Sequence, residues 1–185
     1  IDPGIKHDTS YWVYKEGLKG KHFVLNPDSS LFLGPVWPGI CAFPDFANTK
    51  TRSWWGTLYK DLVNTGIKGF WNDMNEPSVF DVPTKTFPLD TRHNIDGVIS
   101  THAEIHNVYG MQMARGTYDG VRRLRPIERP FVLTRAGYAG TQRYSAAWTG
   151  DNVSSWEHLA MAIPISLNFG LSGQPFVGPD IGGFI

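Results

Sequence analysis

The sequence has little cysteine, little charge and no long apolar run, and each shortage excludes a class of protein. Its single cysteine, Cys41, excludes an internal disulfide framework. Charged residues make up 18% of the chain, and 17 Lys and Arg are balanced by 17 Asp and Glu. This balance argues against nucleic-acid binding and polybasic membrane-surface binding, because both favour an excess of basic residues. No apolar run reaches about 18 residues, so no transmembrane helix is expected.

Aromatic and turn-forming residues, by contrast, are abundant. Hydrophobic residues make up 41% of the chain and aromatic residues 14%, including seven Trp. This is enough apolar material for a packed core and too much for a disordered chain. The 20 Gly and 13 Pro predict many turns. With 185 residues, the chain has room for one ordinary domain or for part of a larger one.

Apolar periodicity and turn residues divide the chain into short strands and longer helices. Residues 7–40 are expected to be irregular apart from a short hairpin, and residues 78–100 to form a loop. Helices are expected over residues 53–64, 101–121 and 154–170; capping-box patterns begin the last two, and Pro164 predicts a kink. Strands are expected to end at residue 1 and to span residues 22–25, 31–33, 67–71, 130–134, 145–148 and 174–177.

The alternation of strands and helices predicts an α/β fold with a parallel sheet covered by helices. Charged residues stand where the strands of this sheet end: Asp2, Asp73, Arg135, Asp151 and Asp180. Because the carboxyl ends of parallel strands meet at one edge, these side chains are expected to gather there. This is where an α/β barrel or an open α/β sheet places its functional site.

Asp73 and Asp151 are the candidate catalytic pair. Each follows a strand that carries aromatic residues. Two carboxylates in different environments can divide the roles of ionised nucleophile and protonated general acid. In a retaining glycosidase, the two carboxyls lie about 5–5.5 Å apart. The alternative, from the residues alone, is that each Asp only caps a strand or a loop.

Aromatic side chains near the expected strand ends favour a sugar as the ligand. Aromatic faces stack on the apolar faces of sugar rings, while carboxylates and Arg bind sugar hydroxyls. The side chains in question are Trp37, Trp71, Tyr138, Trp148 and Phe184. The alternative is that these residues belong to the core, which is the preferred interpretation for the helical Trp54 and Trp55.

One segment carries a long and specific motif. Residues 69–78 read Gly-Phe-Trp-Asn-Asp-Met-Asn-Glu-Pro-Ser, which closely resembles the signature of glycoside hydrolase family 31, the α-glucosidase family. The resemblance continues in the same order over nearly the whole chain. It includes residues 1–3, 36–39, 43–46, 54–55, 129–135, 139–140, 142–144, 148–152 and 177–184. Several long motifs in the right order are far more specific than one short pattern.

The resemblance implies roles for the residues that match the motifs. Asp73 would be the nucleophile that forms a covalent glycosyl-enzyme, and Asp151 would be the general acid and then the base. Arg135 would bind sugar hydroxyls, and Asp180 would support the acid strand. Glu76 is a rival nucleophile by its chemistry, but the motif assigns that role to Asp73 and leaves Glu76 to orient the loop. The subsite for the terminal sugar would be lined by Trp37, Trp71, Met74, Trp148 and Phe184.

The resemblance also implies a partial (β/α)8 TIM barrel. A complete barrel takes about 250 residues, whereas this chain resembles the part from the end of the third strand to the end of the seventh. Residues 1–185 are therefore expected to be one incomplete catalytic barrel domain, with an irregular loop and hairpin region over about 7–40. We expect an excerpt of a longer enzyme, with unpaired strand edges and exposed apolar faces.

The implied function is the catalytic core of a retaining α-glucosidase that hydrolyses terminal α-linked glucose. α-Xylosidase, transglucosidase and α-glucan lyase activities remain open, as does an inactive sugar-binding scaffold. The expected partners are an oligosaccharide or α-glucoside substrate and the rest of the same polypeptide, with no nucleic acid and no membrane. Neither a metal nor an organic cofactor is expected, because two carboxylates and water complete the reaction. The single cysteine and the lack of a visible signal sequence favour the cytoplasm.

Two other patterns predict less. His102 and His106 have the spacing of a zinc-binding helix, but the Glu that should follow the first His is missing. A solvated helix start is expected there instead. Residues 152–154 form an N-glycosylation sequon, but a glycan at that place would block the proposed acid.

Overall fold

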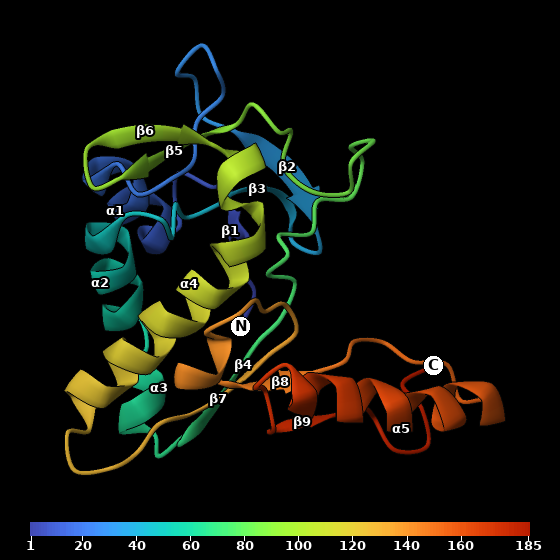
Figure 1. The fold of residues 1–185 in the computed structure, drawn as a ribbon. Helices are drawn as coiled ribbons and strands as arrows, with labels where there is room; N and C mark the ends of the chain where they lie inside the picture. The colour runs from blue at the N-terminus through green and yellow to red at the C-terminus, as the bar shows by residue number, and fades with distance from the viewer.

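A computed structural model describes all of residues 1–185 and contains a parallel sheet, an antiparallel sheet and a separate hairpin (Figure 1). The parallel sheet has the strand order β4-β7-β8-β9, and the antiparallel sheet has the order β1-β3-β2. The parallel strands are β4 (Gly69–Asn72), β7 (Phe131–Thr134), β8 (Ala146–Trp148) and β9 (Val177–Gly178). The others are β1 (Ile5–Lys6), β2 (Leu33–Val36), β3 (Gly39–Ala42) and the hairpin strands β5 (Arg92–Ile95) and β6 (Val98–Thr101).

The register of the parallel sheet brings its carboxyl ends together. Asn72 pairs with Thr134 at the ends of β4 and β7, and Trp148 pairs with Gly178 at the ends of β8 and β9. Ile1 runs beside β4: its nitrogen donates to the Trp71 carbonyl at 2.7 Å, and its carbonyl accepts from the Asp73 amide at 3.1 Å. The predicted parallel α/β arrangement is thus present, with successive strands as neighbours.

Five α-helices accompany these sheets: α1 (Trp12–Gly20), α2 (Thr49–Thr57), α3 (Lys60–Asn64), α4 (His102–Leu124) and α5 (Trp156–Leu171). Local sequence explains several helix ends. The Asn48 side chain caps α2 by accepting from the Lys50 amide at 2.9 Å, and Ser155 caps α5 by accepting from the His158 amide at 3.2 Å. A 3₁₀ turn, η1 (Thr141–Arg143), lies between β7 and β8.

Helices α2 and α4 approach very closely because both carry glycine at the crossing. A Cβ atom added to Gly120 would lie 2.3 Å from the Gly56 Cα, and one added to Gly56 would lie 2.7 Å from the Gly120 Cα. Next to this crossing, Thr117 of α4 accepts a hydrogen bond from the Trp55 indole at 3.1 Å and pairs with the Tyr59 hydroxyl at 2.9 Å. The two helices therefore pack backbone against backbone beside β4.

The hydrophobic core lies in the first two thirds of the chain. It is a cluster of 20 buried residues that extends from Ile5 to Val121 and draws on β1–β4, α1–α4 and the loops between them. The C-terminal segment contributes none of these residues. In Figure 1, α5 projects away from the main body, and 87% of Leu171 and 76% of Phe176 are exposed. The expected exposed apolar face is present here.

Several local predictions are wrong. Helix α1 occupies part of the region expected to be irregular, and the hairpin β5–β6 occupies part of the expected 78–100 loop. The expected hairpin at 22–25 and 31–33 is reduced to an isolated bridge between Leu25 and Leu31, while the true strands β2 and β3 flank Trp37. The single helix expected over 53–64 is two helices, because the chain turns between Thr57 and Lys60.

The two capping-box predictions also need correction. The Thr101 side chain makes no capping hydrogen bond to α4, and Glu104 instead accepts from the Ser100 hydroxyl. At α5 the cap is Ser155 and not Ser154, and the helix continues through Pro164. A neighbouring serine thus takes the place of the predicted partner in both cases.

His102 is buried, so the expected solvated helix start is wrong. It belongs to a chain of side chains that leads inward from His106: the His106–His102, His102–His93 and His93–Asp45 contacts are 2.9, 3.2 and 2.8 Å long. Burial and the two neighbouring His lower the pKa of His102 to about 3. The chain ties α4 to the β5–β6 hairpin and to the loop after β3.

No helix combines the length and the apolar character that crossing a membrane requires.

Candidate active site

Asp73 lies directly after β4, at the carboxyl edge of the parallel sheet. Its Oδ1 atom accepts the Met74 amide at 2.9 Å and pairs with Nη1 of Arg135 at 3.1 Å. Its Oδ2 atom makes no hydrogen bond and does not belong to the buried unpaired atoms, so it remains open to solvent. Asp73 therefore presents one anchored oxygen and one free oxygen.

Arg135, which follows β7, is held by a second carboxylate. Its Nε and Nη2 atoms donate to the two Glu76 oxygens at 2.7 and 2.9 Å, which is a bidentate pair. Nη2 also lies 3.1 Å from the Ser78 hydroxyl oxygen and 3.1 Å from the Met74 sulfur. The Ser78 hydroxyl in turn donates to Glu76 at 2.6 Å. Both Glu76 oxygens are therefore occupied, which argues against Glu76 as a nucleophile.

The loops after β4 and β7 are fastened to each other by Asn75. Its amide nitrogen donates to the Thr134 hydroxyl at 2.8 Å, and its amide oxygen accepts from the Ala136 backbone at 3.0 Å. Asn75 and Thr134 are both fully buried. Asn72, the last residue of β4, donates to the Tyr59 hydroxyl at 3.3 Å and so anchors β4 to the helices. The positions of Asp73 and Arg135 are thus set by buried polar contacts.

Burial raises the pKa of the Asp73 carboxyl above its ordinary value of 3.8. The Met74 amide and the Arg135 charge oppose this rise, while the charges of Asp2 and Glu76 add to it. The charge of Asp2, in the segment beside β4, thus adds to the negative charge around Asp73. The Asp73 carboxyl therefore has two acidic neighbours, Asp2 and Glu76, and one cationic neighbour, Arg135.

Glu76 and Arg135 shift in the directions expected of an ion pair. Burial acts to raise the Glu76 pKa, but hydrogen bonds from Arg135 and Ser78 and the Arg135 charge lower it below the ordinary value. Burial acts to lower the Arg135 pKa, but the Glu76 contact and the charges of Asp73 and Asp151 raise it. The charges of both candidate catalytic acids thus act on Arg135.

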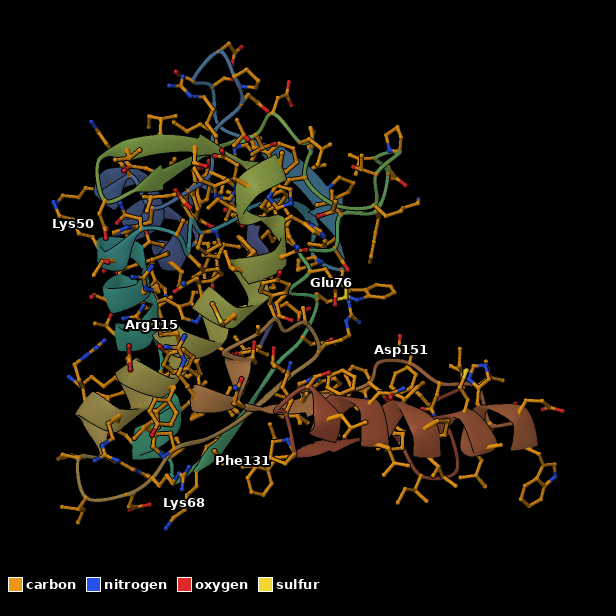
Figure 2. All side chains as sticks on the ribbon, viewed as in Figure 1. Lys50, Lys68, Glu76, Arg115, Phe131 and Asp151 are labelled. Atoms are coloured by element: carbon orange, nitrogen blue, oxygen red, sulfur yellow. The ribbon has the colours of Figure 1, made fainter.

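Asp151 lies after β8, beyond Gly150, whose φ of 94° requires a residue without a side chain. The Asp151 side chain is exposed and makes no ion pair. In Figure 2, Glu76 and Asp151 lie toward one end of the parallel strands, while Phe131 and Lys68 lie toward the other end. The candidate groups therefore share the carboxyl edge of the sheet.

An aromatic group lies beside these charges. The Trp148 ring meets the Trp71 ring edge-on at 5.0 Å between centroids, and it meets Phe184 at 6.1 Å. The Trp148 indole donates to Asp180 at 3.1 Å. Trp148 is buried, whereas 40% of Trp71 and 52% of Phe184 are exposed. The sheet edge thus presents two accessible aromatic rings braced by a third.

The predicted site residues form two contacting groups, and Trp37 and Asp151 belong to neither. Asp73, Met74 and Arg135 are in direct contact. Trp37 follows β2, is 76% exposed and packs edge-on against Phe80, at 4.8 Å between ring centroids. Its contact therefore lies on the loop that follows the Asp73 motif and not on the rings after β8.

The pairing of Glu76 and Ser78 with Arg135 was not predicted from the sequence. Glu76 and Arg135 are separated by 59 residues, so no local pattern could show their contact. The chemistry of the motif offered one signal. Glu76 lies close to Asp73, and burial of two neighbouring carboxylates is costly unless a cation pairs with them.

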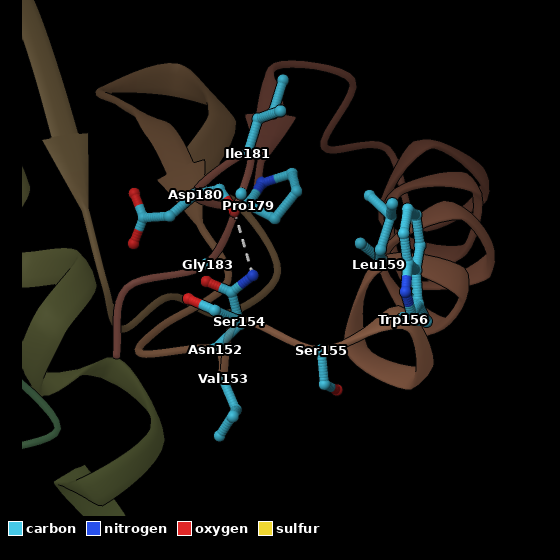
Figure 3. A pocket seen from close by; sticks show the side chains of 12 residues that line it. Asn152, Val153, Ser154, Ser155, Trp156, Leu159, Pro179, Asp180, Ile181 and Gly183 are labelled. Carbon is cyan, nitrogen blue, oxygen red and sulfur yellow. Dashed lines mark hydrogen bonds between the residues drawn. The ribbon is translucent and has the colours of Figure 1, made fainter.

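A pocket of about 470 Å³ lies between the loops after β8 and β9 and the start of α5 (Figure 3). The Asn152 side chain donates to the Asp180 carbonyl at 3.0 Å across one wall. Trp156 and Leu159 of α5 form the opposite wall. Neither Asp73 nor Asp151 lines this pocket, so it flanks the candidate site. No group of three or more His, Cys, Asp or Glu is arranged to hold a metal ion.

Comparison with known proteins identifies the family. A family model described as the TIM-barrel domain of glycosyl hydrolases family 31 matches residues 1–185. Alpha-glucosidase 2 of Bacillus thermoamyloliquefaciens is 52% identical over 184 residues, which cover 100% of this chain and 23% of that protein. A probable glucan 1,3-alpha-glucosidase of Arabidopsis thaliana is 46% identical over 188 residues, covering 100% of this chain and 20% of that protein.

Solved structures agree with this result. A crystal structure of the glucosidase II alpha subunit matches with a TM-score of 0.93 and 42% identity, covering 100% of this chain and 20% of that one. A family 31 alpha-glucosidase from Bacteroides thetaiotaomicron matches with a TM-score of 0.84 and 48% identity, covering 99% and 29%. The chain thus spans less than a third of each of these proteins. Because the family model matches its whole length, the chain belongs to glycoside hydrolase family 31, and its parallel sheet is part of that family's TIM-barrel domain.

Proposed function

We propose that this chain supplies the catalytic carboxylates of a retaining α-glucosidase. Asp73 attacks the anomeric carbon and forms a covalent glycosyl-enzyme, while Asp151 protonates the departing oxygen. Asp151 then removes a proton from the water that releases the sugar. The carrying observation is Asp73 itself, which has one anchored oxygen and one free oxygen at the carboxyl edge of a parallel sheet.

The surroundings of Asp73 and Asp151 support different roles for them. Burial raises the pKa of Asp73, and the contact with Arg135 opposes this rise and favours the ionised form that a nucleophile needs. Asp151 is exposed at the end of β8, where a leaving group and water can reach it. The two acids therefore flank the guanidinium from different strands, with β7 between them.

The terminal sugar would lie against the aromatic group after β8 and β9. Trp71 and Phe184 offer accessible faces for stacking, while Trp148 and its partner Asp180 hold them in place. Arg135 would bind sugar hydroxyls. Met74 and Trp37 would complete the subsite from the side of the β4 loop. An uncharged glucoside suits the zero net charge of the chain.

We propose further that residues 1–185 act as one incomplete barrel domain, running from the end of the third strand to the end of the seventh. Ile1 beside β4, and β9 at the far edge of the sheet, would be the two ends of this segment. The relatives are named glucosidases, and the chain spans 20–23% of their length. The remaining strands of a longer polypeptide would cover the exposed α5 and β9 side chains.

The decisive test is the variant Asp73→Ala in the full-length polypeptide that carries this sequence. Turnover of an aryl α-glucoside should fall by several orders of magnitude, because the covalent step loses its nucleophile. Asp90→Ala removes an exposed carboxylate far along the loop and serves as the matched control with unchanged turnover. Near-normal activity of Asp73→Ala would reject the assignment.

The products separate the remaining activities. A retaining glucosidase releases glucose first as the α-anomer, which NMR detects before mutarotation. An α-glucan lyase would instead release an unsaturated anhydro-sugar, and a transglucosidase would transfer glucose to another sugar. Initial release of the β-anomer would contradict the two-step mechanism.

A further inference from the structure

The contact between Arg135 and the two acids is asymmetric. Arg135 gives its Nε–Nη2 edge to Glu76, with both bonds shorter than 3.0 Å, and gives Asp73 only Nη1 at 3.1 Å. A guanidinium usually prefers to meet a carboxylate through two parallel bonds. Here Glu76 receives that two-point contact, and Asp73 receives a single one.

A count of the guanidinium hydrogens shows what remains available. Arginine has five N–H donors. Nε and one Nη2 hydrogen serve Glu76, and the second Nη2 hydrogen faces Ser78 and Met74. One Nη1 hydrogen serves Asp73, which leaves one Nη1 hydrogen for a substrate hydroxyl. If the guanidinium turned toward Asp73, this hydrogen would bind the free Oδ2 atom of Asp73, and neither would remain available to the substrate.

We propose that Glu76 is a positioning residue that keeps Asp73 reactive by holding the Nε–Nη2 edge of Arg135. This inference rests on the proposed function, in which Asp73 is the nucleophile. With that edge occupied, Arg135 can contact only Oδ1 of Asp73, and Oδ2 stays free. Oδ2 then forms the bond to the anomeric carbon as the glycosidic C–O bond breaks, and the leaving oxygen takes the Asp151 proton.

Ser78 strengthens this arrangement by fixing the roles of its neighbours. Its hydroxyl donates to Glu76 at 2.6 Å and lies 3.1 Å from Nη2 of Arg135, so it accepts from the guanidinium while donating to the carboxylate. Glu76 thus accepts three hydrogen bonds and is held in its ionised form. A carboxylate so occupied neither attacks nor donates a proton, but it can orient Arg135.

Glu76→Gln in the full-length polypeptide tests this role. Glutamine has one acceptor oxygen, and its NH2 group repels the guanidinium, so Arg135 should turn toward both oxygens of Asp73. We expect kcat to fall about 10- to 100-fold, with a smaller change in KM. Losses of this size are found when the hydrogen-bond partner that orients a metal-binding side chain is changed. The acid limb of kcat/KM should also move to lower pH, because Asp73 loses a neighbouring negative charge and gains a second contact from Arg135.

Two further variants make the result decisive. Glu76→Asp keeps the charge but is too short for the two-point contact, so it should move the acid limb in the same direction by less. It carries the test if Glu76→Gln does not fold. Glu16→Gln makes the same chemical change at an exposed position of α1 and should leave kcat and the pH profile unchanged. An acid limb at the wild-type pH in the folded Glu76 variants, whatever the loss of kcat, overturns the inference and indicates a purely structural role.

The outcomes also distinguish this inference from the proposed function. A wild-type polypeptide without activity on α-glucosides, or an active Asp73→Ala variant, rejects the function and the inference together. An active wild type with an inactive Asp73→Ala variant and an unmoved acid limb in the Glu76 variants rejects the inference alone.

Discussion

At the scale of single residues, the site gathers more negative charge than one cation balances. Asp2, Asp73 and Glu76 all influence the same small volume, and Arg135 is in contact with two of them. The pKa of Asp73 is raised, with burial as the largest cause. The ionised form of Asp73 is therefore less stable in the folded protein than in water. This is expected where an active-site group is kept reactive at the expense of folding stability.

Asp73→Asn should accordingly make the full-length polypeptide more stable at neutral pH while abolishing its activity. A carboxyl whose folded pKa is raised favours folding below its unfolded pKa near 3.8 and loses that contribution as pH rises through the folded value. Asparagine keeps the shape without the charge. The gain in Tm, measured by thermal unfolding, should be largest at neutral pH and should shrink as pH falls toward 3.8.

Asp90→Asn is the matched control, because this carboxylate is exposed. Its Tm should follow the wild type at every pH. A Tm of Asp73→Asn at or below that of the wild type at neutral pH would show that the Arg135 contact outweighs the burial of the charge.

At the scale of elements, two glycines decide how the α2–α4 layer supports β4. Gly56 and Gly120 allow the helix backbones to touch, and Thr117 then receives Trp55 and Tyr59. Tyr59 holds Asn72, the last residue of β4 before Asp73. The helix crossing is therefore connected to the nucleophile through two hydrogen bonds.

Gly120→Ala should destabilise the protein by about 1–3 kcal/mol, the usual cost of forcing atoms into a packed contact. The added methyl would lie 2.3 Å from the Gly56 backbone, which cannot move aside as a flexible side chain can. Gly170→Ala is the control on α5, where an added Cβ meets nothing within 4 Å and should be neutral or stabilising by up to about 1 kcal/mol. Urea unfolding measures both, and equal effects of the two substitutions would contradict the close crossing.

At the scale of the whole molecule, the chain has a well-packed part and an open part. The main cluster of 20 core residues ends at Val121, and of α5 only Ala162 is buried. Leu171, Phe176 and Ile181 lie exposed around α5 and β9. Apolar surface of this kind marks a contact site or a tendency to aggregate.

The polypeptide 1–185 on its own should therefore bind the dye ANS and self-associate in light scattering. Replacing both Leu171 and Phe176 by Ser should reduce both signals. Val98→Ser, on the exposed β5–β6 hairpin, is the control that changes a similarly exposed apolar side chain away from α5 and should leave them unchanged. A monomer without ANS fluorescence would show that this apolar surface does not drive self-association in water.

The sequence by itself determined the strands of the parallel sheet and the residues at their ends. The strands expected at 67–71, 130–134 and 145–148 correspond to β4, β7 and β8, because short apolar runs bounded by turn residues are typical of buried strands. Asp73 and Asp151 follow from the same pattern. Periodicity in a short window reports local conformation, so these elements were predictable.

Only the tertiary structure decided which charged and polar side chains pair with each other. Arg135 pairs with Glu76 across 59 residues, Trp148 with Asp180 across 32, and His93 with Asp45 across 48. The burial of His102 beside His93 likewise became visible only in the folded chain. Burial makes an ionised or polar group pair with whatever the fold brings within reach, and the sequence alone does not show that distance.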